Sequence, residues 1–73
     1  MKIKFTIPTE LEVVTGFDKN ESTPIYETDV FNTGEIADAD VLEENPHFNT
    51  ATIQFGDGTV AYGVPCECFE VIN

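Results

Sequence analysis

The sequence predicts an all-β fold for residues 1–73, which form one domain built as a small five- to six-stranded barrel. Apolar and polar residues alternate with period two in several short runs, and no stretch repeats with a helical period. A Gly-flanked Asp-Gly step at Gly56–Gly58 is typical of a tight hairpin between two such runs. Because a sheet this small would otherwise expose its edges, we expect it to close or partly close.

The first half of the chain contains two clear strands and one ambiguous segment. Alternate apolar side chains share one face along Met1–Ile7, and Pro8 ends or deflects that strand. A second alternating strand is expected over Glu10–Phe17. The segment Asp18–Pro24 is rich in loop-forming residues and predicts a loop. The pattern of Ile25–Phe31 is mixed, which leaves a short strand and a linking arm as alternatives.

Alternation returns in the second half of the chain, on both sides of a turn. In Glu35–Val41 the alanines and the valine face one way and the aspartates face the other. The Asn45-Pro46 step marks a turn, and Ala51–Phe55 alternates again before it enters the hairpin.

The strand that leaves the hairpin presents Val60, Tyr62 and Val64 on one face, so the alternation predicts that Tyr62 belongs to the core. Pro65 ends this strand. A short 3₁₀ turn is expected near Pro65–Cys68, followed by a last strand at Phe69–Ile72.

Three segments resemble the SH3-like barrels of the Tudor and chromo-barrel kind. Thr33–Val41 resembles the strand after the first long loop of these barrels. Ala51–Pro65 resembles their paired third and fourth strands, in which an apolar V-x-F-x-D-G run enters the hairpin. Cys66–Ile72 matches their 3₁₀ turn and closing strand. The resemblance covers residues 30–72 and implies the fold, whereas this barrel hosts many unrelated activities.

Tudor-type barrels bind methylated Lys or Arg in an aromatic cage. The candidates that this resemblance implies here are Tyr26, Phe31, Phe55 and Tyr62, and the chain has no Trp. An adaptor that docks a basic or methylated peptide in such an aromatic groove is therefore an alternative function.

Charge is distributed very unevenly along the chain. The formal net charge is −11, and no Lys or Arg follows Lys19. Charge this one-sided is not expected to be organised as salt bridges. The resulting field repels nucleic acid and anionic membranes and attracts basic protein surfaces. In size and charge the chain also resembles phage-encoded acidic inhibitors that mimic DNA, including those directed at bacterial nucleoid proteins of the HU class.

Several carboxylates are expected on strand surfaces, where folding would hold them in place. Asp38 and Asp40 share one strand face about 7 Å apart, while DNA presents a phosphate about every 3.4 Å along each strand. We therefore expect a phosphate-like array. Its candidate partner-binding residues are Glu27, Asp29, Glu35, Asp38, Asp40, Glu43 and Glu44.

The leading hypothesis is a DNA mimic that blocks the basic nucleic-acid-binding surface of a nucleoid-associated or transcription protein. It would bind no nucleic acid or membrane itself, and the pattern leaves a homodimer open. The alternatives are the adaptor described above and a small structural subunit whose acidity serves solubility.

Neither metal binding nor catalysis is predicted, and no cofactor is expected. The segment Asp18–Asp29 loosely resembles an EF-hand loop, but Thr23 stands where Gly is required. Cys66, Cys68 and His47 fall short of a zinc set, and at least one of the cysteines is expected to pack as a small apolar residue. No nucleophile and base have a spacing that suggests an active site.

The chain shows no apolar run long enough to span a membrane and no signal peptide after its Met1-Lys2 start. We therefore expect a cytoplasmic protein, in the host cytoplasm if it is phage-encoded, with reduced cysteines.

Overall fold

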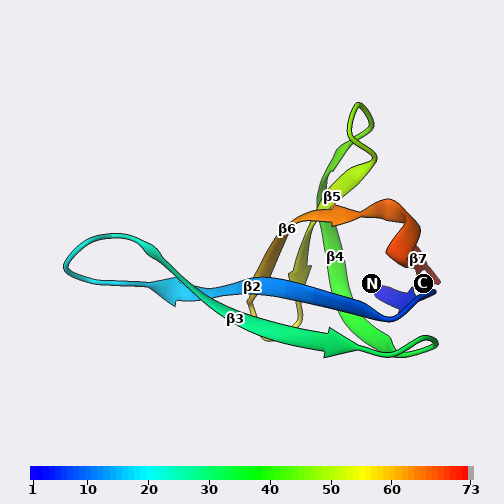
Figure 1. Ribbon diagram of the computed structural model, residues 1–73, viewed down its shortest axis with the longest axis horizontal. Helices are drawn as coiled ribbons and strands as arrows, with labels where there is room; N and C mark the ends of the chain where they lie inside the picture. The colour runs from blue at the N-terminus through cyan, green and yellow to red at the C-terminus, as the bar shows by residue number, and fades with distance from the viewer. Residues whose placement is uncertain (73) are drawn as a thin grey trace.

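The computed structural model describes residues 1–72, which are almost entirely β-structure (Figure 1). No helix in this part of the chain is long and apolar enough to cross a membrane. Seven strands and one 3₁₀ turn follow one another along the described residues: β1 (Lys2–Phe5), β2 (Thr9–Phe17), β3 (Pro24–Phe31), β4 (Ile36–Asn45), β5 (Thr50–Phe55), β6 (Val60–Pro65), η1 (Cys66–Cys68) and β7 (Phe69–Val71).

The expected count of five to six strands is therefore wrong. The segment left open between strand and arm, Ile25–Phe31, lies in a full strand, because β3 pairs with β2 along its whole length from Pro24 to Phe31. Both descriptions of the segment hold in part, since this strand also forms one side of a projecting hairpin (Figure 1).

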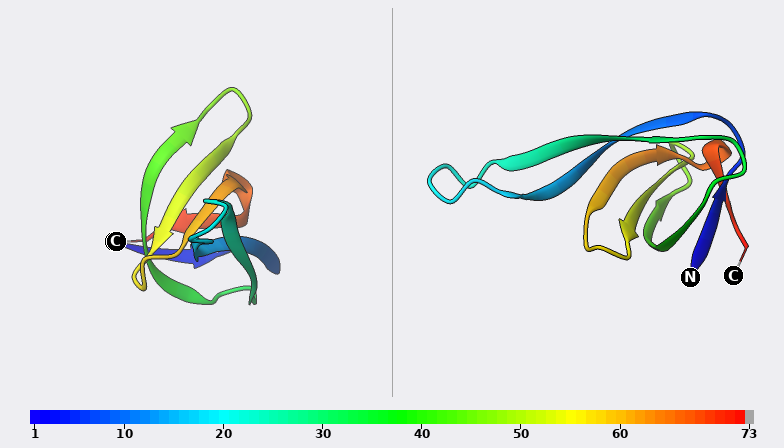
Figure 2. Two further views of the ribbon diagram at one scale, coloured as in Figure 1. Left: turned by 90° about the vertical axis from the view of Figure 1, so that its left-hand side faces the viewer. Right: turned by 90° about the horizontal axis from the view of Figure 1, so that it is seen from below.

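All strand pairs are antiparallel and form one sheet in the order β3-β2-β6-β5-β4-β1-β7. The sheet curls so that β4, β5 and β6 arch over β1 and β7, while the β2–β3 hairpin extends away as a long arm (Figure 2). In the following text, the inner face of a strand is the one that carries the core residues, and the outer face is the opposite one.

The core is small and is built from alternate residues of the strands around the curl. Ile3, Phe5, Ile53 and Val64 are fully inaccessible to solvent. Phe31 packs against this cluster, and its ring stacks on Phe5 with centroids 4.2 Å apart. Each fully buried side chain of this size contributes about 1.5–3 kcal/mol, so these few residues dominate the stability of the fold.

The predicted hairpin and 3₁₀ turn are confirmed. Gly58 adopts a φ of +92°, which glycine tolerates best, and its N–H donates to the carbonyl of Phe55 at 2.9 Å. The Asp57 carboxylate closes the turn by accepting from the N–H of Thr59 at 3.0 Å and from its hydroxyl at 2.7 Å. The 3₁₀ turn spans Cys66–Cys68.

The prediction that Tyr62 belongs to the core is wrong, because a bulge in β6 shifts the alternation. Ala51 pairs with Val64 while Ile53 pairs with Ala61, so β6 uses one residue more than β5 over this stretch. The extra residue is accommodated at Gly63, which has a φ of +66°. Ala61 and Val64 are therefore both buried, and Tyr62 is 65% exposed.

Candidate functional site

The aspartates of β4 lie on the outer face of the sheet. Ala39 is buried and Ala37 is half-buried on the inner face, so the intervening Asp38 and Asp40 point outward and are exposed. This is the arrangement that the alternation in Glu35–Val41 predicted for these two carboxylates.

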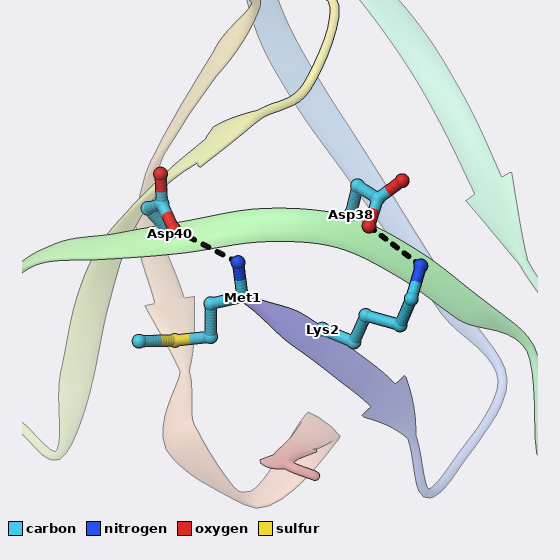
Figure 3. Close-up of polar contacts among 4 residues, drawn as sticks. All are labelled: Met1, Lys2, Asp38 and Asp40. Carbon is cyan, nitrogen blue, oxygen red and sulfur yellow. Dashed lines mark hydrogen bonds and ion pairs between the residues drawn. The ribbon is translucent and has the colours of Figure 1, made fainter. Parts of the chain in front are cut away.

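Both aspartates form ion pairs with the N-terminus of the chain (Figure 3). The Lys2 ammonium donates to Asp38 Oδ1 at 2.6 Å, and the α-amino group of Met1 donates to Asp40 Oδ1 at 3.3 Å. The expectation that the one-sided charge would not form salt bridges is thus wrong here. The reason is topological, because β1 lies antiparallel to β4 with Lys2 directly opposite Asp38.

The pairing alters the acidity of one of these groups. The pKa of Asp38 lies below its ordinary value of 3.8, chiefly because Lys2 donates a hydrogen bond to the carboxylate and also because its positive charge favours the anion. The pKa of Asp57 is also lowered, first by the backbone hydrogen bond from Thr59 and then by the bond from its side chain. Asp57 stabilises the hairpin turn, whereas Asp38 is one of the candidate partner-binding carboxylates.

The next carboxylates of β4 follow an irregularity in that strand. The register shifts between Val41 and Glu43, so that Leu42 is the additional residue. Glu43 then lies opposite Thr52 on the outer face, and Glu44 lies opposite Ala51. Both glutamates are exposed near the β4–β5 turn. Glu43 extends the aspartate row on the outer face toward this turn, whereas Glu44 lies on the inner face with Ala51.

Glu35 lies in the turn before β4 rather than on a strand. One of its carboxylate oxygens accepts a long hydrogen bond of 3.4 Å from the N–H of Asn32, and the side chain is exposed. Glu35 therefore lies beside the start of β4, next to the aspartates of that strand but outside it.

The remaining two candidates lie elsewhere on the molecule. Glu27 and Asp29 belong to β3, and three strands separate β3 from β4 in the sheet. Their partners across the ladder are Val13 and Leu11, so both carboxylates share the inner face of the sheet with core residues. The structure thus divides the seven predicted residues into a β4 group with Glu35 and a separate β3 pair.

Two acidic residues that were absent from the predicted set lie on the outer face of the sheet, as Asp38 and Asp40 do, but on β2, which β6 and β5 separate from β4. Glu10 and Glu12 are exposed on the outer face of β2, between the buried Thr9, Leu11 and Val13. Their alternation with Leu11 and Val13 was the available signal. Of the chain's 14 carboxylates, only that of Asp29 belongs to a half-buried residue, and two form ion pairs within residues 1–72.

A pocket of about 270 Å³ opens on the outer face across β4, β5 and β6. Glu43 and Asn45 line one side, Tyr62 and Gly63 line the other, and Thr50–Thr52 forms the floor. The two strand irregularities meet here, since the bulge in β6 turns Tyr62 outward and the shift in β4 places Glu43 on the same face. An aromatic ring and a carboxylate in one hollow can receive a cationic side chain.

The four aromatic residues suggested for a cage do not converge. Phe31 stacks with Phe55 at 5.5 Å between centroids, and both belong to the packed interior. Tyr26 is exposed on the β3 arm, whereas Tyr62 is exposed on β6. A cage built from these four residues is therefore not formed.

The cysteines and the loop at Asp18 serve the fold. Cys68 is buried beneath the 3₁₀ turn, as expected for at least one cysteine, and Cys66 is half-buried. Asp18 Oδ1 accepts from the N–H groups of Asn20 at 2.8 Å and Glu21 at 3.2 Å, which stabilises the predicted loop. Within residues 1–72, no three His, Cys, Asp or Glu side chains are grouped so that they could hold a metal ion.

Comparisons with protein-family models, with curated proteins and with solved structures found no match to this chain.

Proposed function

We propose that this protein is an acidic DNA mimic that binds the basic nucleic-acid-binding surface of a host DNA-binding protein and blocks DNA competitively. One observation carries the proposal: 13 of the 14 side-chain carboxylates are exposed, nine of the 14 lie on strands of the sheet, and only two form an ion pair within the described residues. Fixed positions distinguish such an array from a flexible acidic tail, which has no shape to match.

The proposal includes an SH3-like barrel as the scaffold. Three features support it: the β4–β5–β6 meander, the 3₁₀ turn that follows, and the pairing of the last strand, β7, with the first. In this reading the β2–β3 arm occupies the place of the first long loop.

The contact residues of the proposed mimic fall into two classes. Asp38 and Asp40 already have cations beside them, so a basic partner must compete with Lys2 and the N-terminus for them. Glu10, Glu12 and Glu43 are exposed and form no salt bridge within residues 1–72. We therefore assign more of the partner contact to these glutamates, and expect association that is fast and sensitive to salt.

A capture experiment tests the proposal. Immobilised protein is exposed to a bacterial lysate, and the bound proteins are eluted by a salt gradient and identified. We expect basic DNA-binding proteins in the late fractions. The matched control carries Glu10→Gln and Glu12→Gln and should release the same proteins at lower salt. A neutral partner that elutes independently of salt would contradict the proposal.

The pocket at Tyr62 favours one second candidate, an adaptor that binds a basic or methylated peptide. Its support is the combination of the exposed Tyr62 ring with Glu43 in one hollow. For this function, Tyr62→Ala would weaken partner binding more than the neutral pair Asp38→Asn and Asp40→Asn, and salt would matter less. The reverse order of effects would favour the mimic.

Both candidates act by binding alone, without catalysis or a cofactor. The site of action that we propose is the cytoplasm, or the host cytoplasm if the chain is phage-encoded, because basic nucleic-acid-binding proteins are found there.

A further inference from the structure

The two ends of the sheet differ in length and exposure. β7, at one end, has 3 residues, whereas β3, at the other end, has 8. Within residues 1–72, β3 is hydrogen-bonded to β2 alone. The N–H and C=O groups of every second residue of β3 therefore point away from the sheet. A long free edge of this kind is a template for another strand.

The position of β3 leaves this edge accessible. It lies on the arm that projects from the curled body, and no other strand covers its free side in the two orthogonal views (Figures 1 and 2). Six of its residues are exposed, and only Asp29 and Phe31 are half-buried.

The two faces of β3 differ chemically. On the outer face lie Tyr26, Thr28 and Val30, of which Tyr26 is 55% and Val30 is 65% exposed. On the inner face lie Glu27 and Asp29, which form no salt bridge within the described residues. A strand added here would meet apolar and β-branched side chains on one face and negative charge on the other.

A second copy of β3 does not fit this edge. In an antiparallel pair of two such strands, directly opposite residues share a face. The two registers with the longest overlap are centred on Glu27 and on Thr28. The first places Glu27 opposite its own copy, and the second places Glu27 opposite Asp29 of the other chain. Like charges directly opposite one another destabilise a ladder, so the acidic pair acts against self-association.

We propose that the free edge of β3 binds an extended strand of a partner in which Lys or Arg alternates with apolar or β-branched residues. The basic side chains lie beside Glu27 and Asp29, and the apolar ones pack on Tyr26 and Val30. Main-chain hydrogen bonds provide affinity, and the alternating side chains provide selectivity. This inference goes beyond DNA mimicry, because it concerns how a basic partner is held and does not require that the partner bind DNA.

A synthetic peptide provides the first test. The probe is a short, monomeric peptide in which Lys alternates with Val and Thr, titrated into the full chain by calorimetry. A second peptide has the same sequence, but its backbone nitrogens are methylated, which keeps every charge and removes the main-chain donors. We expect the methylated peptide to bind at least about tenfold more weakly. Equal binding of the two peptides would overturn the proposal.

Amide hydrogen exchange locates the bound peptide. With the unmethylated probe, the amides of residues 25–31 that point away from β2 should become slower to exchange, because they acquire acceptors. Slower exchange confined to β7 or to the pocket at Tyr62 would contradict the assignment to β3.

Matched charge variants separate the edge from the general field. Glu27→Gln with Asp29→Asn removes two charges beside the proposed strand. Glu67→Gln with Glu70→Gln removes two charges from η1 and β7, at the other end of the sheet. We expect the first pair to weaken peptide binding about tenfold and the second to change it by about twofold or less. Equal losses would show that only the overall charge attracts the peptide.

Discussion

The curled body and the β2–β3 arm handle negative charge in different ways. On the body, Asp38 and Asp40 pair with two cations at the start of the chain, Lys2 and the α-amino group of Met1. On the arm, Glu12 and Glu27 are exposed and form no ion pair within the described residues. The comparison shows that two of the chain's cations pair with carboxylates of the body, whereas the arm's carboxylates, and Lys19 at its tip, form no ion pair within the described residues.

The two regions differ in packing as well. The rings of Phe5, Phe31 and Phe55 stack in the core, where Phe31 is the last residue of β3, whereas farther out on the arm Phe17 is 63% and Tyr26 is 55% exposed. An isolated two-stranded hairpin is at best marginally stable in water. A partner that covers the exposed aromatic residues of the arm would therefore bury apolar surface and stabilise the hairpin.

The largest expected effect is on the body. Phe5→Ala removes a fully buried ring that stacks on Phe31, and we expect it to lower the free energy of unfolding by about 3–5 kcal/mol. Tyr26→Ala on the arm is the matched control and should change it by about 0.5 kcal/mol or less. Urea unfolding followed by circular dichroism measures both, and a comparable loss for Tyr26→Ala would contradict the exposed position of the Tyr26 ring.

The next effect concerns the bulge that exposes Tyr62. At Gly63, with its φ of +66°, a Cβ would meet no atom within 4 Å, so Gly63→Ala should cost only the backbone strain, about 1–2 kcal/mol. At Gly16 a Cβ also has open space and the φ is not in the left-handed region. Gly16→Ala should therefore be neutral or stabilising by about 0.4–1 kcal/mol. Equal unfolding free energies for the two variants would contradict the bulge geometry.

A smaller effect is expected when charges are removed from the two regions separately. Glu10→Gln with Glu12→Gln should weaken binding to a basic partner by about 1 kcal/mol. Neither carboxylate forms an ion pair within residues 1–72, so both are free to contact the partner's basic side chains. Asp38→Asn with Asp40→Asn changes the net charge equally but also releases two cations, and should cost less. Dissociation constants at two salt concentrations provide the measurement, and a larger loss for the aspartate pair would reverse our assignment of the contact.

The smallest effect concerns acidity. Lys2→Met should raise the pKa of Asp38 toward its ordinary value of 3.8, because the hydrogen bond and the positive charge are both lost. Since the folded pKa of Asp38 is depressed, its stabilising contribution is present above the unfolded value and is lost as the pH falls through the folded one. Carboxyl ¹³C titration by NMR follows this directly, and an unchanged pKa in Lys2→Met would show that the pair does not persist in solution.

The sequence predicted a strand reliably only where one face of that strand is buried. Where one face of a strand is buried, as in Glu35–Val41 and Ala51–Phe55, period-two alternation located the strand correctly. In Pro24–Phe31 most side chains are exposed, so burial imposes no pattern and the segment stayed ambiguous. Tyr62 was misplaced because alternation presumes a regular ladder, and a single glycine with positive φ shifts the faces.

The candidate site was predictable in its residue types but not in its arrangement. The exposure of Asp38 and Asp40 followed from local alternation. Their pairing with Lys2 and Met1 depends on β1 lying beside β4, which is a contact between segments far apart in sequence. The separation of Glu27 and Asp29 from the β4 group likewise follows from the strand order alone.

The central claim is competition with DNA, and one binding measurement tests it most directly. A basic DNA-binding protein captured from lysate is saturated with a fluorescently labelled duplex. The acidic 73-residue chain is then titrated in at constant salt, while anisotropy and sedimentation are recorded. Our account predicts that the duplex is released in full and that no species contains all three components. A stable ternary complex, with the duplex still bound at saturating protein, would contradict it.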